Sequence, residues 1–166
     1  MGSEMCIRDS RKNNEWVESR YVCKFMDVPY QNNDASNNYP VIRYADVILM
    51  YAEALNQNGK TAEACKYLNM TRRRGFGYQT TETSPVDLQT TDKAQFALMV
   101  EQERRVELAF ENHRWFDLIR TGRAVEVMKS KGFSLNETNL ICPIPQKQID
   151  VNPKLTQNDY KIESRN

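Results

Sequence analysis

Two glutamates stand inside the apolar stripe of the segment 91–120, where a carboxylate is least expected. Wound as a helix, the segment repeats large apolar side chains at i, i+3 and i+4 spacing, namely Phe96, Met99, Val100, Val106 and Phe110. Glu103 and Glu107 fall in the middle of this stripe. A buried carboxylate without a cationic partner costs more free energy than the neighbouring apolar contacts return. The sequence therefore predicts that both glutamates pair with arginines.

Charged residues of two other helical segments are the candidate partners. Arg114, Asp117 and Arg120 recur at three-residue spacing in a short helix just downstream. We expect Arg43 and Arg114 to contact the glutamates, because both lie beside apolar helix faces. We interpret the whole set as a structural ion-pair network that holds helices in register, made of Arg43, Asp46, Glu103, Glu107, Arg114 and Asp117.

Catalytic and metal-binding roles for the same carboxylates are less favoured. Glycosidases normally set two carboxylates across a cleft on separate elements, whereas Glu103 and Glu107 share one helix face. Glu111 and His113 would add ligands for a metal, yet the sequence has no HExxH motif and no equivalent pair of histidines. It also contains no nucleophile elbow and no phosphate loop. We therefore expect no enzyme activity, no metal and no cofactor.

Length, charge and cysteine spacing narrow the class of protein. The 166 residues suffice for one ordinary domain or a piece of a larger one. The 23 basic and 22 acidic residues give a net charge of +1, which argues against binding to nucleic acid. No apolar run of the sequence approaches membrane-spanning length. The widely spaced cysteines lack any CxxC pair, which favours buried thiols over a metal site: Cys6, Cys23, Cys65 and Cys142.

A helical hairpin is expected between Pro40 and Gly75. Its first helix, about residues 41–56, is apolar on most of its circumference and should be central in the fold. Gly59 ends it, and Thr61 offers a cap for a second helix that runs to about Arg74. Small residues after Gly59 are typical of a tetratricopeptide-type hairpin, which generally needs about three stacked units for stability. A single hairpin is therefore expected to leave the outer side of residues 41–56 exposed.

The other segments predict shorter or irregular structure. Residues 1–10 share no periodicity with the residues after them and are interpreted as a non-native leader. Residues 16–39 indicate one or two short strands and a polar loop. Residues 76–90 predict a long exposed loop, residues 123–131 a short helix, and residues 138–153 an extended, proline-bounded segment with a turn of helix. The expected fold class is thus all-α.

Four motifs, in this order and at these separations, resemble one known family. They are RYADVILMYAEALNQ, ERRVELAFENHRWFDLIR, CPIPQKQI and NPKLTQNDY. Together they resemble the C-terminal part of SusD/RagB-type outer-membrane nutrient-binding lipoproteins, over about residues 20–160. The resemblance implies a tetratricopeptide-like helical hairpin with further packed helices, as a fragment of a larger helical-repeat fold. On this basis residues 11–166 are expected to be the C-terminal part of such a domain.

The resemblance also implies a function and partners. Such proteins are surface-exposed lipoproteins of the outer membrane, and they cover a TonB-dependent, SusC-like transporter to capture oligosaccharides or peptides. The expected role is therefore a non-catalytic subunit for starch or other glycan uptake, of which this chain is a scaffold. The alternative is a tetratricopeptide-type scaffold for protein–protein interaction. Trp16 and Tyr78 are the candidate ligand-binding aromatics within the chain.

Overall fold

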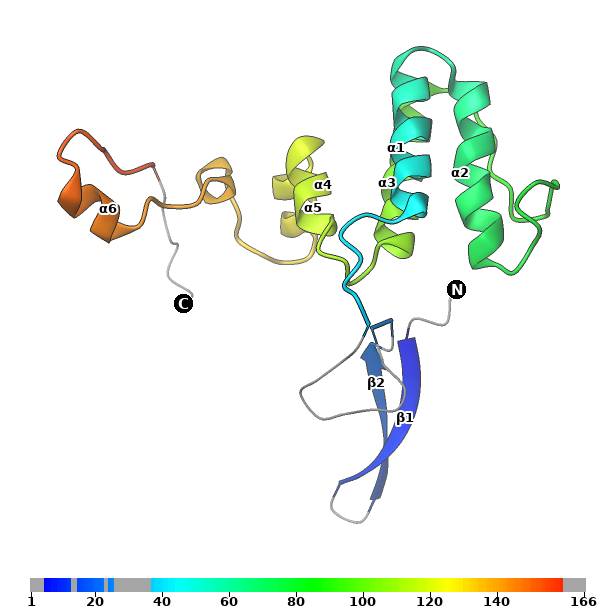
Figure 1. Ribbon diagram of the computed structural model, residues 1–166, viewed down its shortest axis with the longest axis horizontal. Coiled ribbons are helices and arrows are strands. Elements are labelled where there is room, and N and C mark those ends of the chain that lie inside the picture. Colours follow the sequence, from blue (N-terminus) through cyan, green and yellow to red (C-terminus); the bar gives the residue numbers. More distant parts are fainter. Residues whose placement is uncertain (1–4, 13–14, 23, 26–36, 160–166) are drawn as a thin grey trace. The chain divides into compact units, whose positions relative to one another are not determined.

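A computed structural model describes residues 5–12, 15–22, 24–25 and 37–159 (Figure 1). The chain divides into two compact units. The first unit covers residues 1–114 and the second residues 115–166. The first holds strands β1 (Met5–Lys12) and β2 (Glu15–Val22) and helices α1 (Tyr44–Gln57), α2 (Thr61–Gly75) and α3 (Lys93–Glu107). From the end of the first unit onward come α4 (Arg114–Arg120), α5 (Ala124–Ser130), the 3-10 helix η1 (Glu137–Leu140) and α6 (Gln146–Val151). The predicted helical fold class is confirmed.

The two strands form an antiparallel hairpin. Their register pairs Met5 with Val22 and Lys12 with Glu15. The second strand lies where the sequence predicts one, but its partner includes residues 5–10, which the sequence alone does not connect to the fold. The non-native origin of residues 1–10 stays a prediction. Most of the polar loop expected over residues 31–38 lies outside the described residues.

Helices α1 and α2 form the expected hairpin. Gly59 has φ +76°, a left-handed conformation that glycine adopts without steric cost, and it turns the chain between the two helices. The amide of Lys60 donates to the carbonyl of Leu55 at 2.9 Å, which closes the turn. Thr61 is not the cap that the sequence predicts: it is the first helical residue, and its hydroxyl donates to the side chain of Asn56 at 2.8 Å.

Helix α3 packs against both helices of this hairpin and completes the core of the first unit (Figure 1). The core combines small residues, which let the helices approach closely, with larger apolar side chains: Ala52, Leu55, Ala64, Cys65, Leu68, Phe96 and Val100. The face of α1 that points away from this core leaves large apolar side chains in solvent, as the lone hairpin predicts: Tyr44, Val47, Met50 and Tyr51.

The apolar stripe of α3 is shorter than the sequence predicts. Phe96 and Val100 are buried, but Val106 and Phe110 are each about half exposed. The helix ends at Glu107, so Phe110 lies beyond it with φ +66°, and helical spacing no longer places it. The buried positions at the end of α3 are instead the charged residues Glu103, Arg104 and Glu107. Charge pairing takes the place of apolar packing there.

The loop between α2 and α3 is anchored by polar side chains. Asn69 of α2 brackets Leu88, with its side chain donating to the Leu88 carbonyl and accepting from the Leu88 amide, each at 2.9 Å. Arg73 forms a two-point ion pair with Asp87. These contacts tie the second half of a long polar loop to the helix before it.

The cysteines whose side chains are described differ in their burial. Cys65 is buried in the core, but Cys142 is exposed because it lies in the irregular, proline-bounded segment before α6. The side chains of Cys6 and Cys23 are not among those described.

Within residues 5–12, 15–22, 24–25 and 37–159, no helix is long and apolar enough to cross a membrane.

Candidate functional site

The end of α3 is the point where charged side chains from three elements meet. Arg43, the residue just before α1, directs its guanidinium at this end and holds Glu111 at two points, through Nε at 2.8 Å and Nη2 at 2.7 Å. The same Nη2 donates to the Glu107 carboxylate at 2.9 Å and to the Glu107 carbonyl at 3.0 Å. A planar guanidinium is suited to such multiple contacts. We call Lys24, Arg43, Arg74, Glu107 and Glu111 the charge cluster.

Lys24 caps the same helix end. Its ammonium donates to the carbonyls of Glu107 at 2.9 Å and Ala109 at 3.2 Å, and it forms an ion pair with Glu111. The last carbonyls of a helix have no partner within the helix, and they carry the negative end of its dipole. With these groups satisfied, the chain can turn sharply at Phe110 and Asn112, both at left-handed φ values. The sequence gives no sign that Lys24 takes part.

Arg74, in the last turn of α2, completes the charge cluster. Its Nη2 lies 2.6 Å from each oxygen of the Glu107 carboxylate. The Arg74 side chain is 53% exposed, whereas that of Glu107 is 6% exposed. The sequence suggests only that the basic end of α2 suits the helix dipole. In the structure it supplies a direct partner for a buried carboxylate.

Glu103 also has an arginine partner, although not a predicted one. Arg72 of α2 donates to its carboxylate at 3.1 Å and to the carbonyl of Val86 at 2.6 Å. Burial raises the pKa of Glu103, and the contact with Arg72 offsets only part of this effect. Burial therefore disfavours the ionised form of Glu103.

The other predicted network residues lie in separate pairs. Arg104 donates to Asp46 at 2.6 Å, with both side chains almost fully buried between α3 and α1. Arg114 contacts Glu101 at 3.1 Å instead of Glu103 or Glu107. In the second unit Asp117 accepts from Arg120 at 2.9 Å, one turn along the same helix. The six residues of the predicted network thus belong to several separate ion pairs. Arg43 and Glu107 are the two of them that pair with each other.

The electrostatics of the charge cluster keep Glu111 ionised. Burial alone raises its pKa, but hydrogen bonds from Arg43 and Lys24 outweigh this and hold the pKa below its ordinary value. Arg43 responds in the opposite sense, because its contact with Glu111 raises its pKa despite burial. A carboxylate held by two cations is a weak base and has few lone pairs left for a substrate. This arrangement favours a structural role.

The two candidate ligand-binding aromatics are not brought together by any contact in the described part of the chain. Trp16 lies on β2 opposite Arg11, and its side chain is not among those described. Tyr78 lies in the loop after α2, half exposed, with its amide bonded to the Arg73 carbonyl at 2.9 Å. Their role in ligand binding stays a prediction.

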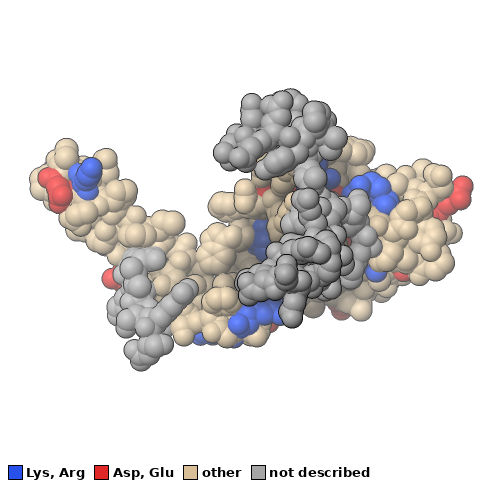
Figure 2. All heavy atoms as spheres, turned by 90° about the horizontal axis from the view of Figure 1, so that it is seen from below, with Lys and Arg blue, Asp and Glu red and all other residues tan. Residues whose placement is uncertain are grey.

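On the face seen in Figure 2, basic and acidic side chains occur as small separate groups on a largely uncharged surface. Among the described residues there is also no group of three histidine, cysteine or acidic side chains placed to hold a metal ion. Glu103, Glu107 and Glu111 are instead engaged by arginine and lysine side chains.

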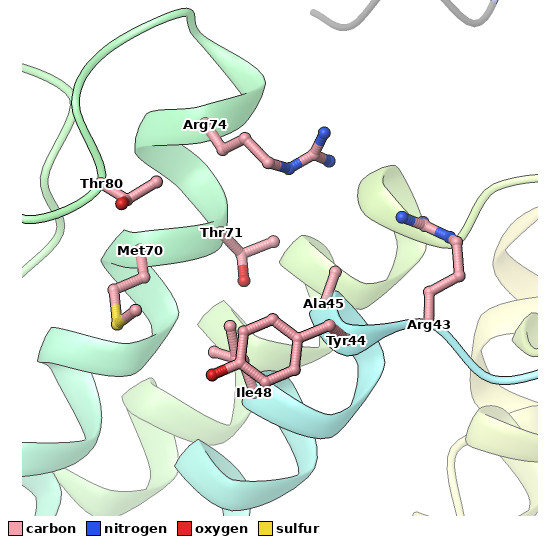
Figure 3. A pocket seen from close by; sticks show the side chains of 8 residues that line it. All are labelled: Arg43, Tyr44, Ala45, Ile48, Met70, Thr71, Arg74 and Thr80. Carbon is pink, nitrogen blue, oxygen red and sulfur yellow. The ribbon is translucent and has the colours of Figure 1, made fainter.

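Next to the charge cluster, a pocket opens between α1 and α2 (Figure 3). It is lined by residues of both helices and of the following loop: Arg43, Tyr44, Ala45, Ile48, Met70, Thr71, Arg74 and Thr80. The guanidinium groups of Arg43 and Arg74 point toward one another at one end of the pocket (Figure 3). The sequence does not predict this pocket, because it depends on how the two helices are rotated about their axes.

Residues 7–160 match the model of the SusD family. The chain is 36% identical to SusD-like protein P38 of Formosa agariphila and 33% identical to SusD-like protein P25 of the same organism, and it spans 28% of the length of each. These matches include 85% and 84% of the chain, respectively.

The fold is also similar to those of two solved structures of SusD-type proteins. A SusD superfamily protein from Bacteroides fragilis superimposes with a TM-score of 0.66 at 25% identity, over 93% of this chain and 36% of that one. A SusD homologue from Bacteroides thetaiotaomicron gives a TM-score of 0.61 at 31% identity, over 91% of this chain and 29% of that one.

Proposed function

The chain belongs to the SusD family, and from this membership we propose that it is the C-terminal scaffold of a non-catalytic nutrient-binding subunit. The observation that supports this role most is the charge cluster. Its carboxylates hold helix ends together and are already engaged by cations. The proposed nutrient is an oligosaccharide, with a peptide as the second choice.

The proposed cellular setting follows from the family. In this setting the whole protein is a lipoprotein on the outer surface of the outer membrane. Its proposed partner is a TonB-dependent, SusC-like transporter, over which it captures the nutrient before import. Because the chain spans only 28% of the length of its SusD-like relatives, most of the ligand contacts are assigned to other parts of the whole protein.

The ligand assignment is tested by titration. A panel of neutral oligosaccharides and peptides is titrated by calorimetry into the 166-residue chain and into a longer polypeptide that carries it. We expect saturable binding by the longer polypeptide and at most weak binding by the chain. Equal affinities for both would place the nutrient site within these residues and overturn the assignment.

The non-catalytic assignment has its own test. Both polypeptides are incubated with chromogenic glycosides and peptide substrates, with a known glycosidase and a protease as positive controls. We expect no turnover, because Glu103, Glu107 and Glu111 are committed to ion pairs. Turnover that disappears in Glu107→Gln, at a temperature where the variant is folded, would show that Glu107 is catalytic.

The exposed side of α1 favours one alternative, a helical scaffold that binds a protein partner. Large apolar side chains of this helix are in solvent, with Tyr44 at 75% and Met50 at 45% exposure. Export separates the two functions: an intracellular location of the whole protein would favour the scaffold, whereas surface labelling of intact cells would favour nutrient binding.

A further inference from the structure

The turn between α1 and α2 contains the only asparagine–glycine pair of the sequence, Asn58–Gly59 (Figure 1). Asn58 directly follows α1, and both residues of the pair are exposed. Because glycine has no Cβ, its backbone nitrogen can approach the side-chain amide of the residue before it without hindrance. The functions proposed above give this pair no role.

The side chain of Asn58 is not held in place by the described part of the chain. No described residue forms a hydrogen bond with its amide group. Asn56, two residues earlier, is fully buried, donates to the carbonyl of Lys93 at 3.0 Å and accepts from the hydroxyl of Thr61 at 2.8 Å. Of these two asparagines, Asn58 is therefore the one whose side chain can reorient in solvent.

The backbone at Gly59 is open to solvent but restrained by hydrogen bonds. A Cβ placed on Gly59 would meet no atom within 4 Å beyond its chain neighbours. The amide of Gly59 donates to the carbonyl of Asn56 at 3.1 Å, and that of Lys60 donates to the carbonyl of Leu55 at 2.9 Å. Asn58 has ψ 12°, and this angle must rotate before the Gly59 nitrogen can reach the Asn58 side chain. Because helix ends fray, the fold slows this rotation but does not prevent it.

From these observations we propose that Asn58 is a site of spontaneous backbone modification. The Gly59 nitrogen loses its proton to the solvent and attacks Cγ of Asn58. A carbon–nitrogen bond forms, and the side-chain nitrogen takes up a proton and leaves as ammonia, which gives a five-membered succinimide ring. Water then opens the ring. Cleavage between the Gly59 nitrogen and Cγ gives aspartate, whereas cleavage between this nitrogen and the main-chain carbonyl carbon gives isoaspartate.

Isoaspartate would change the hairpin more than aspartate does. Its main chain runs through Cβ and Cγ, so it adds one methylene group between the Leu55 carbonyl and the Lys60 amide, whose hydrogen bond closes the turn. The hydrogen bond from Thr61 to the buried Asn56 spans the same stretch. Aspartate adds the same negative charge but leaves the length of the main chain unchanged. The isoaspartate form is therefore expected to be the less stable of the two.

Incubation of the folded 166-residue chain at mildly alkaline pH, well below its unfolding temperature, tests the proposal. An L-isoaspartyl methyltransferase with labelled S-adenosylmethionine detects isoaspartate, and peptide mapping by mass spectrometry locates it. Asn38 is the internal control, because it is also exposed but is followed by Tyr39. We expect conversion at Asn58 to be at least about tenfold faster than at Asn38. Equal rates at the two asparagines would overturn the proposal.

A synthetic peptide with the sequence of residues 52–63 gives the rate without the fold. We expect the folded chain to react more slowly than the peptide, because the hydrogen bonds at Gly59 and Lys60 must open first. No conversion in the folded chain by the time the peptide has reacted completely would contradict the proposal. Asn58→Ser should abolish the isoaspartate signal, and a signal that persists in this variant would place the modification elsewhere.

Thermal unfolding measures the effect of the modification on the hairpin. The isoaspartate form is isolated by chromatography, and Asn58→Asp is the matched control, because it has the same charge and an unmodified main chain. We expect the isoaspartate form to melt at a lower temperature than Asn58→Asp, since the added methylene group disturbs the turn. Equal melting temperatures would contradict the inferred effect on the hairpin.

Discussion

Asp46 and Arg104 form the most deeply buried ion pair between α1 and α3 in the described part of the chain. Their side chains are 5% and 6% exposed, and Arg104 donates to Asp46 at 2.6 Å. In contrast, Arg74 is half in solvent beside Glu107. At the scale of single residues, the cost of removing one partner of an ion pair depends on whether the charge of the other partner stays buried away from water.

This difference predicts a contrast between two substitutions. Arg104→Leu leaves the Asp46 carboxylate buried without this partner, and it should reduce the free energy of unfolding by about 3–5 kcal/mol. Arg74→Gln removes an exposed charge whose partner keeps Arg43, so it should cost about 0–1 kcal/mol. Urea unfolding at about pH 7 measures both. Equal losses for the two variants would contradict this account of burial.

The loop contact of Asp87 predicts a dependence on pH. The hydrogen bond from Arg73 holds the pKa of Asp87 well below its ordinary value of about 4. The contact therefore stabilises the fold fully above about pH 4 and loses this contribution as the pH falls through the folded pKa. Asp87→Asn should lose less stability than the unmodified chain between about pH 5 and about pH 2.5. Thermal unfolding at several pH values measures this, with the exposed Asp150→Asn as control; parallel curves for Asp87→Asn and the unmodified chain would contradict it.

At the scale of elements, side chains that hydrogen-bond to the free backbone groups stabilise the helix ends, and the sequence predicts only some of these contacts. Asp92 caps α3, because its carboxylate accepts from the amide of Gln95 at 2.6 Å. Thr61 does not cap α2, and the residue before α2, Lys60, makes no side-chain cap. At the other end of α3, cations from outside the helix satisfy the last carbonyls.

The cap of α3 predicts the effect of Asp92→Ala. Loss of the accepted hydrogen bond should lower the free energy of unfolding by about 0.5–2 kcal/mol. Asp92→Asn retains an oxygen acceptor and is the matched control, with a smaller loss expected. Chemical denaturation compares the three proteins, and an alanine variant as stable as the unmodified chain would show that the cap contributes nothing.

Helix positions can be predicted closely from the sequence, because periodicity and glycine stops are local signals. The sequence predicts a first helix over about residues 41–56, and Tyr44–Gln57 is observed. The start differs because Arg43 is extended, with φ −112° and ψ 156°, and directs its side chain to α3. Apolar residues at 41 and 42 resemble a first helical turn although they precede the helix.

For a buried carboxylate, the sequence predicts which type of residue on another helix is its partner, but not which individual residue. Burial of Glu103 and Glu107 implies that arginines pair with them. The rotation of α2 against α3 determines that these are Arg72 and Arg74, and sequence periodicity does not predict this rotation. Lys24 is 83 residues away from Glu107 in sequence and has no pattern that connects the two. The pocket beside Thr71 depends on the same kind of rotation, so the sequence contains no local signal for it.

At the scale of the whole molecule, the outer side of α1 is an exposed apolar face. Tyr44, Val47 and Met50 are 75%, 44% and 45% exposed, and exposed apolar side chains gathered on one helix face often mark a contact region. The chain also spans only 28% of the length of the SusD-like relative P38. We therefore expect this face to be a contact region.

This face predicts the behaviour of the chain by itself. It should bind the dye 8-anilinonaphthalene-1-sulfonate and associate with itself, because the exposed apolar side chains gain by leaving water. A double variant, Val47→Lys with Met50→Lys, should reduce both dye fluorescence and the apparent mass in light scattering. Leu98→Lys changes an exposed apolar residue of α3 and is the matched control. A monodisperse, dye-silent chain would contradict the prediction.

The patterned charges of this chain are proposed to hold a scaffold together and not to bind the nutrient. The most direct test measures the thermal stability and the affinity for neutral oligosaccharides of a longer polypeptide carrying Arg72→Gln and Glu107→Gln. Because these changes remove ion pairs between α2 and α3, we predict a lower melting temperature and an unchanged Kd at a temperature where the protein is folded. A Kd about tenfold weaker at an unchanged melting temperature would contradict the claim.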